Sequence, residues 1–171
     1  KYFNDIKTEI DLDQYSNEEY FDLTDEINQV ASKQFKDIKE RIESKSFPVI
    51  SYGLIAINVI AFAMMYLLGN GSRDYFTLVK FGALIPEVVI MFNQYYRLFT
   101  SAFLHFDLIH LFFNCYALYL FGKATERLIG PIKYLLVYIM SILMSSLFVM
   151  VFSGTGVAAG ASGGIYGLLG A

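Results

Sequence analysis

The 171-residue chain is 56% hydrophobic, a larger share than soluble domains usually have, and this favours membrane-spanning segments. Its formal net charge of −3 argues against a nucleic-acid partner, because such a partner selects a basic surface. Residues 1–46 hold 12 of the 16 acidic and 7 of the 13 basic residues, so a polar first part precedes an apolar second part. The sequence begins at Lys1 and its last apolar pattern stops in mid-run, from which we expect a fragment of a longer protein.

Residues 1–46 are expected to form a soluble, partly helical segment. Ser16 and Glu19 have the spacing of a capping box, which marks the start of a helix. Apolar residues then recur at helical intervals in two stripes that we interpret as out of phase with one another, namely Tyr20, Leu23, Ile27 and Val30, followed by Phe35, Ile38 and Ile42. We predict an amphipathic helix, or a pair of helices, that packs against another surface.

Residues 47–171 are expected to form a helical membrane domain. Residues 47–68 carry no charge, and a helix of that length, at about 1.5 Å per residue, can cross a hydrocarbon core of roughly 30 Å. Residues 69–106 contain charges and are too interrupted to span, so we expect helices that lie in the membrane interface. Further spans are predicted at about 107–122 and 131–152, and a fourth begins at 162 and runs onward to 171.

Basic residues outside the spans predict the orientation of the chain. The positive-inside rule places a group of bases before the first span on the cytoplasmic side: Lys33, Lys36, Lys39, Arg41 and Lys45. The loop from Gly122 to Lys133 carries three bases and is placed inside for the same reason. Residues 69–106 then lie outside, and the fourth span also begins on the outer side.

This topology brings three polar side chains to one depth near the outer end of the spans. His110 and Asn114 are four residues apart and share one helix face, and Ser162 opens the fourth span. Polar groups are costly in lipid, so a functional site is the first hypothesis for this set. The alternative is that His110 and Asn114 only hydrogen-bond neighbouring helices.

The stretch "GASGG" has two interpretations. Gly160 and Gly163 flank Ser162 in a Gly-x-Ser-x-Gly pattern, which is typical of exposed nucleophiles, and free N–H groups at a helix N-terminus suit a developing oxyanion. The second interpretation is packing, because Gly163 and Gly167 form a row of small residues that lets helices approach closely. Both can hold for the same helix.

These motifs together resemble the rhomboid family of intramembrane serine proteases. The stretch "HFDLIHLFFN" is similar to the family's His-x-x-x-x-His-x-x-x-Asn pattern, and "GASG" is followed by a tyrosine four residues after the serine. "YYR" stands where the family usually has Trp-Arg, and "ERLIG" is close to its Glu-x-x-x-Gly. The residues that carry the resemblance are His105, His110, Asn114, Ser162, Tyr166, Arg97 and Glu126.

The resemblance implies an all-α helical bundle of six spans, of which about three and a half are present, and a serine endopeptidase that cleaves transmembrane protein substrates within the lipid bilayer. Ser162 would be the nucleophile, and His110 and Asn114 would complete an oxyanion hole. The base would be a histidine in a later span, supported by Tyr166 and approaching the face of Gly163 and Gly167, so the chain by itself is expected to be inactive.

The resemblance also assigns structural roles and a cellular location. His105 and Arg97 would hold the outer connection. No metal or other cofactor is expected, and a bacterial protein with several spans in the plasma membrane is implied. Two alternatives stay open: an inactive relative that binds membrane clients, and a small membrane transporter, which would more often carry acidic residues in its spans.

Overall fold

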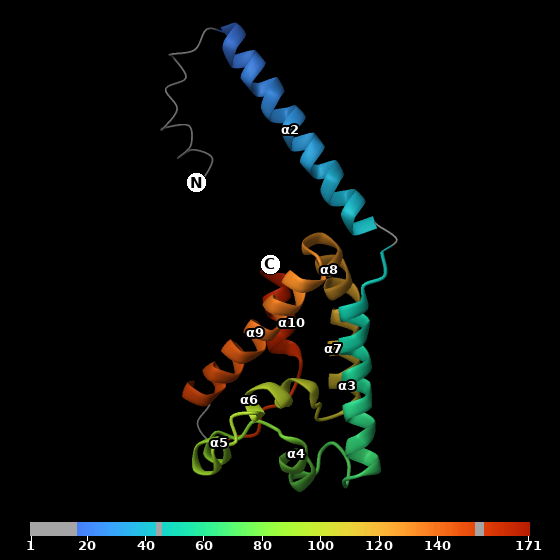
Figure 1. Cartoon of the computed structure of the whole chain (residues 1–171), viewed down its shortest axis with the longest axis vertical. Coiled ribbons are helices and arrows are strands. Elements are labelled where there is room, and N and C mark those ends of the chain that lie inside the picture. Colours follow the sequence, from blue (N-terminus) through green and yellow to red (C-terminus); the bar gives the residue numbers. More distant parts are fainter. Residues whose placement is uncertain (1–16, 44–45, 153–155) are drawn as a thin grey trace. The chain divides into compact units, whose positions relative to one another are not determined.

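The computed structural model of the chain describes residues 17–43, 46–152 and 156–171 (Figure 1). The chain separates into two compact units, residues 1–43 and residues 44–171, which are treated separately below. The regular elements of the described residues are helices, apart from one isolated bridge between Leu84 and Ala158. The predicted all-α membrane fold is therefore confirmed.

The described part of the first unit is one unbroken helix, α2, Asn17–Glu43. Ser16, the first half of the predicted capping box, lies outside the described residues. The prediction of two stripes out of phase is wrong for the side chains that are described. Ile27 and Ile38 are eleven residues apart, which is about three turns of an uninterrupted α-helix, so they lie on the same face.

In the described part of the second unit, two helices are long and apolar enough to cross a membrane, α3, Val49–Leu67, and α9, Pro131–Phe152, and a bent helix pair, Arg97–Phe103 with Leu108–Ile129, would make a third span if it is counted as one. Between them, α7, Leu108–Ala117, continues through a π-helical turn, Leu118–Gly122, into α8, Lys123–Ile129. Helical backbone thus occupies much of the segment where sequence analysis placed a loop, and the break comes at Gly130, whose φ is 85°. The last helix, α10, is Ser162–Leu169 and runs beside α9 (Figure 1).

Four short helices form the connection between α3 and α7: α4, Tyr75–Phe81; α5, Pro86–Phe92; α6, Arg97–Thr100; and a 3-10 turn, Ser101–Phe103. They gather at the end of this unit opposite α8 (Figure 1). Asp74 caps α4 by accepting hydrogen bonds from the Thr77 hydroxyl and backbone N–H, both at 2.7 Å. These bonds stabilise the carboxylate and hold the pKa of Asp74 below its usual value.

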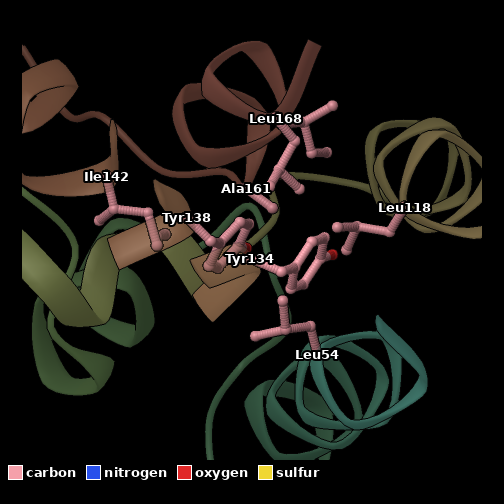
Figure 2. Packing of buried hydrophobic residues seen from close by; sticks show 9 residues of the cluster. Leu54, Leu118, Tyr134, Tyr138, Ile142, Ala161 and Leu168 are labelled. Atoms are coloured by element: carbon pink, nitrogen blue, oxygen red, sulfur yellow. The ribbon is translucent and has the colours of Figure 1, made fainter. Parts of the chain in front are cut away.

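The core of the second unit is built on α9. Tyr134 and Tyr138 are buried one helical turn apart and stack in parallel, with ring centroids 6.5 Å apart. Side chains from the other helices close around these rings, among them Leu54 of α3, Leu118 of the π-helical turn and Leu168 of α10 (Figure 2). The spans therefore pack around one apolar cluster, and this fixes the position of α10.

Glu126 of α8 hydrogen-bonds the start of α3, at the end of the unit opposite the short helices α4 to α6 (Figure 1). Its carboxylate accepts hydrogen bonds from the backbone N–H of Ile50 at 3.0 Å, the N–H of Ser51 at 2.8 Å and the Ser51 hydroxyl at 2.7 Å. The first N–H groups of a helix have no partner within the helix, and the N-cap residue Pro48 supplies no side-chain bond to them. Glu126 therefore caps α3 from a distant position in the sequence.

Small residues let α9 and α10 approach closely, as predicted. A Cβ atom added to Gly163 would lie 2.5 Å from the Ser145 hydroxyl oxygen, and one added to Gly167 would overlap the Ser141 side chain. This glycine face is covered by α9, so the expectation that a later span approaches it is wrong. The uncovered face of α10 carries Tyr166, which is 74% exposed.

Candidate active site

The connection between α3 and α7 holds the turn that begins α7. Asp107 is the N-cap residue of α7, and one of its carboxylate oxygens accepts from the backbone N–H of His110 at 2.8 Å. The other oxygen accepts from the Arg73 guanidinium at 3.1 Å. The neighbouring Ser72 hydroxyl donates to the carbonyl of Phe106 at 2.9 Å. Ser72 and Arg73 thus hold Phe106 and Asp107, the two residues that lead into α7.

This turn sets the orientation of the His110 ring. The ring packs edge-on against His105, with centroids 5.0 Å apart, and lies nearly parallel to Phe106, with centroids 6.0 Å apart. His105 itself is fully buried. His110 is therefore held between two aromatic rings that come from the residues just before its own helix.

Asn114 lies one turn further along α7 and is buried. Its amide nitrogen donates to the carbonyl of His110 at 2.9 Å. The bond is within one helix, so among the described residues no hydrogen bond from the Asn114 side chain joins α7 to another span. A primary amide has two N–H groups, and this bond uses one of them.

Arg97 is buried within the connection between α3 and α7 and holds its segments together. Its guanidinium donates to the carbonyls of Val79 and Ala83, both at 2.9 Å, and to the Gln94 side chain at 2.7 Å. The residue is 4% exposed, and a buried guanidinium needs such partners because its charge cannot be left unpaired. Arg97 thus joins the end of α4 to the end of α5. Sequence analysis expected it to hold this connection.

The loop before α10, residues 156–161, is hydrogen-bonded to the connection between α3 and α7. Leu84 and Ala158 exchange two backbone hydrogen bonds, of 3.0 and 2.9 Å, and the N–H of Gly160 donates to the carbonyl of Ser101 at 3.0 Å. Gly160 has a φ of 135°, a conformation that residues with a side chain rarely adopt. These contacts fix the chain immediately before Ser162.

Ser162 is the first residue of α10 and its side chain is exposed. A Cβ atom added to Gly160 would lie 2.8 Å from Nε2 of His110 and 4.0 Å from Oγ of Ser162, so both side chains lie beside this glycine. Only glycine leaves room for the His110 ring there. The structure brings together residues from two helices that lie about fifty positions apart in the sequence.

Asn114 and Ser162 both line a groove between α7 and α10. Ser162 and Tyr166 line it from α10, and Asn114 and Phe113 line it from α7. A separate cavity is also lined by Ser162, together with Ser101 and Ser145. Ser162 therefore stands between an open groove and a polar cavity.

Sequence analysis missed Asp107 and the Ser101 and Ser145 hydroxyls. Asp107 stands three residues before His110, and this spacing of a carboxylate before a helix is itself a capping signal. The two serines carried no signal, because isolated serines occur throughout membrane helices. The described residues contain no group of three His, Cys, Asp or Glu side chains that could hold a metal ion.

Helices long enough to cross a membrane, together with a groove lined by Ser162 and Asn114 and with His110 beside Gly160, define a polytopic membrane protein with a polar site between α7 and α10. Residues 92–171 match the family model described as Rhomboid domain. The chain belongs to the rhomboid family, a family of intramembrane proteases.

Named relatives agree with this assignment. The chain is 38% identical over 124 residues to Rhomboid protease GluP of Bacillus subtilis (strain 168), covering 72% of this chain and 24% of GluP. It is 37% identical over 105 residues to RHOMBOID-like protein 1 of Arabidopsis thaliana, covering 61% and 26%. It is 32% identical over 95 residues to Inactive RHOMBOID-like protein 8 of Arabidopsis thaliana, covering 56% and 27%. The chain spans about a quarter of the length of these relatives.

Proposed function

We propose that the protein is an intramembrane serine endopeptidase in which Ser162 attacks a peptide bond of a transmembrane substrate. The observation that carries the proposal is that Ser162 of α10 and Asn114 of α7 line one groove, while Ser162 and His110 lie beside Gly160. Polar side chains gathered within membrane spans mark a functional site by default. Membership of a protease family supports the same reaction class.

In the proposed mechanism, Oγ of Ser162 forms a bond to the carbonyl carbon while its proton passes to a base. The carbonyl oxygen becomes an oxyanion, and donors for it are the backbone N–H of Ser162 at the start of α10 and the side chains of His110 and Asn114. Asn114 has a second N–H group for this role, since only one is used by the carbonyl of His110. Collapse of the intermediate breaks the C–N bond as the amine takes the proton, and water then hydrolyses the acyl-enzyme.

The base is proposed to be a histidine in a span that follows residue 171. His105 is buried against His110, and His110 is assigned to the oxyanion, so neither ring is free for the task. The uncovered face of α10 supports a later span at this place, because Tyr166 is exposed there, one turn after Ser162. The fluorophosphonate probe of serine hydrolases should label Ser162 in the complete protein and label residues 1–171 poorly.

The decisive variant is Asn114→Ala in the complete protein. Loss of one oxyanion donor should slow turnover about 10²-fold or more while the melting temperature in detergent changes little. A purely structural role predicts the reverse, a fall in melting temperature with normal turnover by the folded fraction. Cys115→Ala is the matched control, because Cys115 is the next residue of α7 and lines neither the groove nor the cavity.

The second candidate is a relative that binds membrane clients without cleaving them. One of the matched proteins carries the word inactive in its name, so membership of the family alone does not decide the matter. If the complete protein retains a transmembrane client but neither cleaves it nor reacts with the probe at Ser162, this second function replaces the first. For either function we propose the plasma membrane, with residues 1–46 in the cytoplasm.

A further inference from the structure

Asp107 lies directly before α7 and binds the first turn of this helix twice. One carboxylate oxygen accepts from the backbone N–H of His110 at 2.8 Å, and the backbone carbonyl of Asp107 accepts from the N–H of Leu111 at 3.0 Å. The first N–H groups of a helix have no acceptor within the helix, so the N–H of His110 depends on the Asp107 side chain. Asp107 therefore holds the residue whose ring lies beside Gly160.

His110 in turn orients Asn114. The backbone carbonyl of His110 accepts from Nδ2 of Asn114 at 2.9 Å. His110 is thus bound at its N–H by Asp107 and at its carbonyl by Asn114, and its ring packs so closely on Gly160 that an added Cβ atom would lie 2.8 Å from Nε2. A displacement of His110 would therefore move both side chains that are proposed to bind the oxyanion.

The second carboxylate oxygen of Asp107 makes a weaker contact. It accepts from the Arg73 guanidinium at 3.1 Å, and the Arg73 side chain is 77% exposed. Exposed ion pairs contribute little, because water and salt screen them. The hydrogen bond to the N–H of His110 is thus the contact that sets the position of the helix turn. An uncharged acceptor of the same shape should serve nearly as well as the carboxylate.

We propose that Asp107 is a positioning residue of the peptidase reaction, which fixes His110 and, through the His110 carbonyl, Asn114 where the oxyanion forms. This role rests on the proposed function of Ser162. A misplacement of about 1 Å can slow a reaction about 10²-fold, so removal of the Asp107 side chain should lower kcat by about 10- to 10²-fold. KM should change little, because the donors act on the oxyanion and not on the bound substrate.

The test compares Asp107→Ala, Asp107→Asn and Asp74→Ala in the complete protein. Cleavage of a transmembrane substrate and the rate of fluorophosphonate labelling at Ser162 are both measured per folded protein. Asp107→Ala should slow both reactions. Asp107→Asn should stay within about threefold of the natural protein, because its amide oxygen can still accept from the His110 N–H and only an exposed ion pair is lost.

Asp74→Ala is the matched control for loss of a helix cap. Asp74 is the N-cap residue of α4 and accepts from the backbone N–H of Thr77 at 2.7 Å, so its removal costs stability in the same way. Because α4 carries none of the proposed oxyanion donors, Asp74→Ala should lower the melting temperature and keep the normal kcat of the folded fraction.

Three results would overturn the role of Asp107: equal kcat values for Asp107→Ala and Asp74→Ala, an effect of Asp107→Ala on KM alone, or Asp107→Asn as slow as Asp107→Ala. In each case the natural protein still cleaves the substrate and is labelled at Ser162, so the proposed function stands. If the natural protein neither cleaves nor is labelled, the proposed function fails and the role of Asp107 falls with it.

Discussion

Replacing Gly167 by alanine should separate the two helices that position Ser162. A Cβ atom on Gly167 would overlap both Oγ and Cβ of Ser141, whereas Cα of Ser141 would stay at an ordinary 3.7 Å. Rotation of the Ser141 side chain moves Oγ but cannot move Cβ, so α9 and α10 must shift apart. Overpacking of this kind typically costs about 1 to 3 kcal/mol.

Gly53→Ala supplies the matched control, because a Cβ atom on this α3 glycine meets nothing within 4 Å. Both variants gain helix propensity of about 1 kcal/mol, so the free energy of unfolding of Gly167→Ala should lie about 1 to 3 kcal/mol below that of Gly53→Ala. Reversible unfolding of the complete protein in mixed micelles measures both values. Adding Ser141→Gly to Gly167→Ala should recover most of the difference; equal stability of the two alanine variants, or no recovery, would refute the close approach described for these helices.

Three further outcomes are expected. Glu126→Gln should lower the free energy of unfolding by about 1.5 to 3 kcal/mol, because an amide cannot accept all three bonds from the start of α3; unchanged thermal stability would contradict this cap. The pKa of Asp74 is lowered in the folded state, so its stabilisation is complete above its usual pKa of about 3.9 and is lost as the pH falls through the lowered value. Melting temperatures between pH 2 and 6 should therefore fall more steeply in the natural protein than in Asp74→Asn, and parallel curves would exclude the effect. In intact cells that express the protein with Cys115 replaced, an impermeant maleimide added outside should label Glu87→Cys and should not label Lys133→Cys. The opposite labelling pattern would reverse the proposed orientation.

Residue spacing alone determined much of this protein. Apolar runs of about twenty residues predicted α3 within one or two residues of its observed bounds and α9 at its observed bounds, because hydrocarbon thickness sets the length of a span. The interval between His110 and Asn114 placed both on one face of α7, because helical geometry depends only on local sequence. The start of α10 at Ser162 was predicted in the same way.

Only the tertiary structure decided which faces meet. The glycine row of α10 could have received either a later span or α9, and complementary small residues at Ser141 and Ser145 give it to α9. Sequence analysis placed Glu126 in a motif on a loop, yet it caps α3 across about seventy-five residues. Asp107 is linked to Arg73 only by the fold of the connection between α3 and α7. Contacts between distant segments depend on the packing of whole helices, and local periodicity carries no information about which helix supplies the partner.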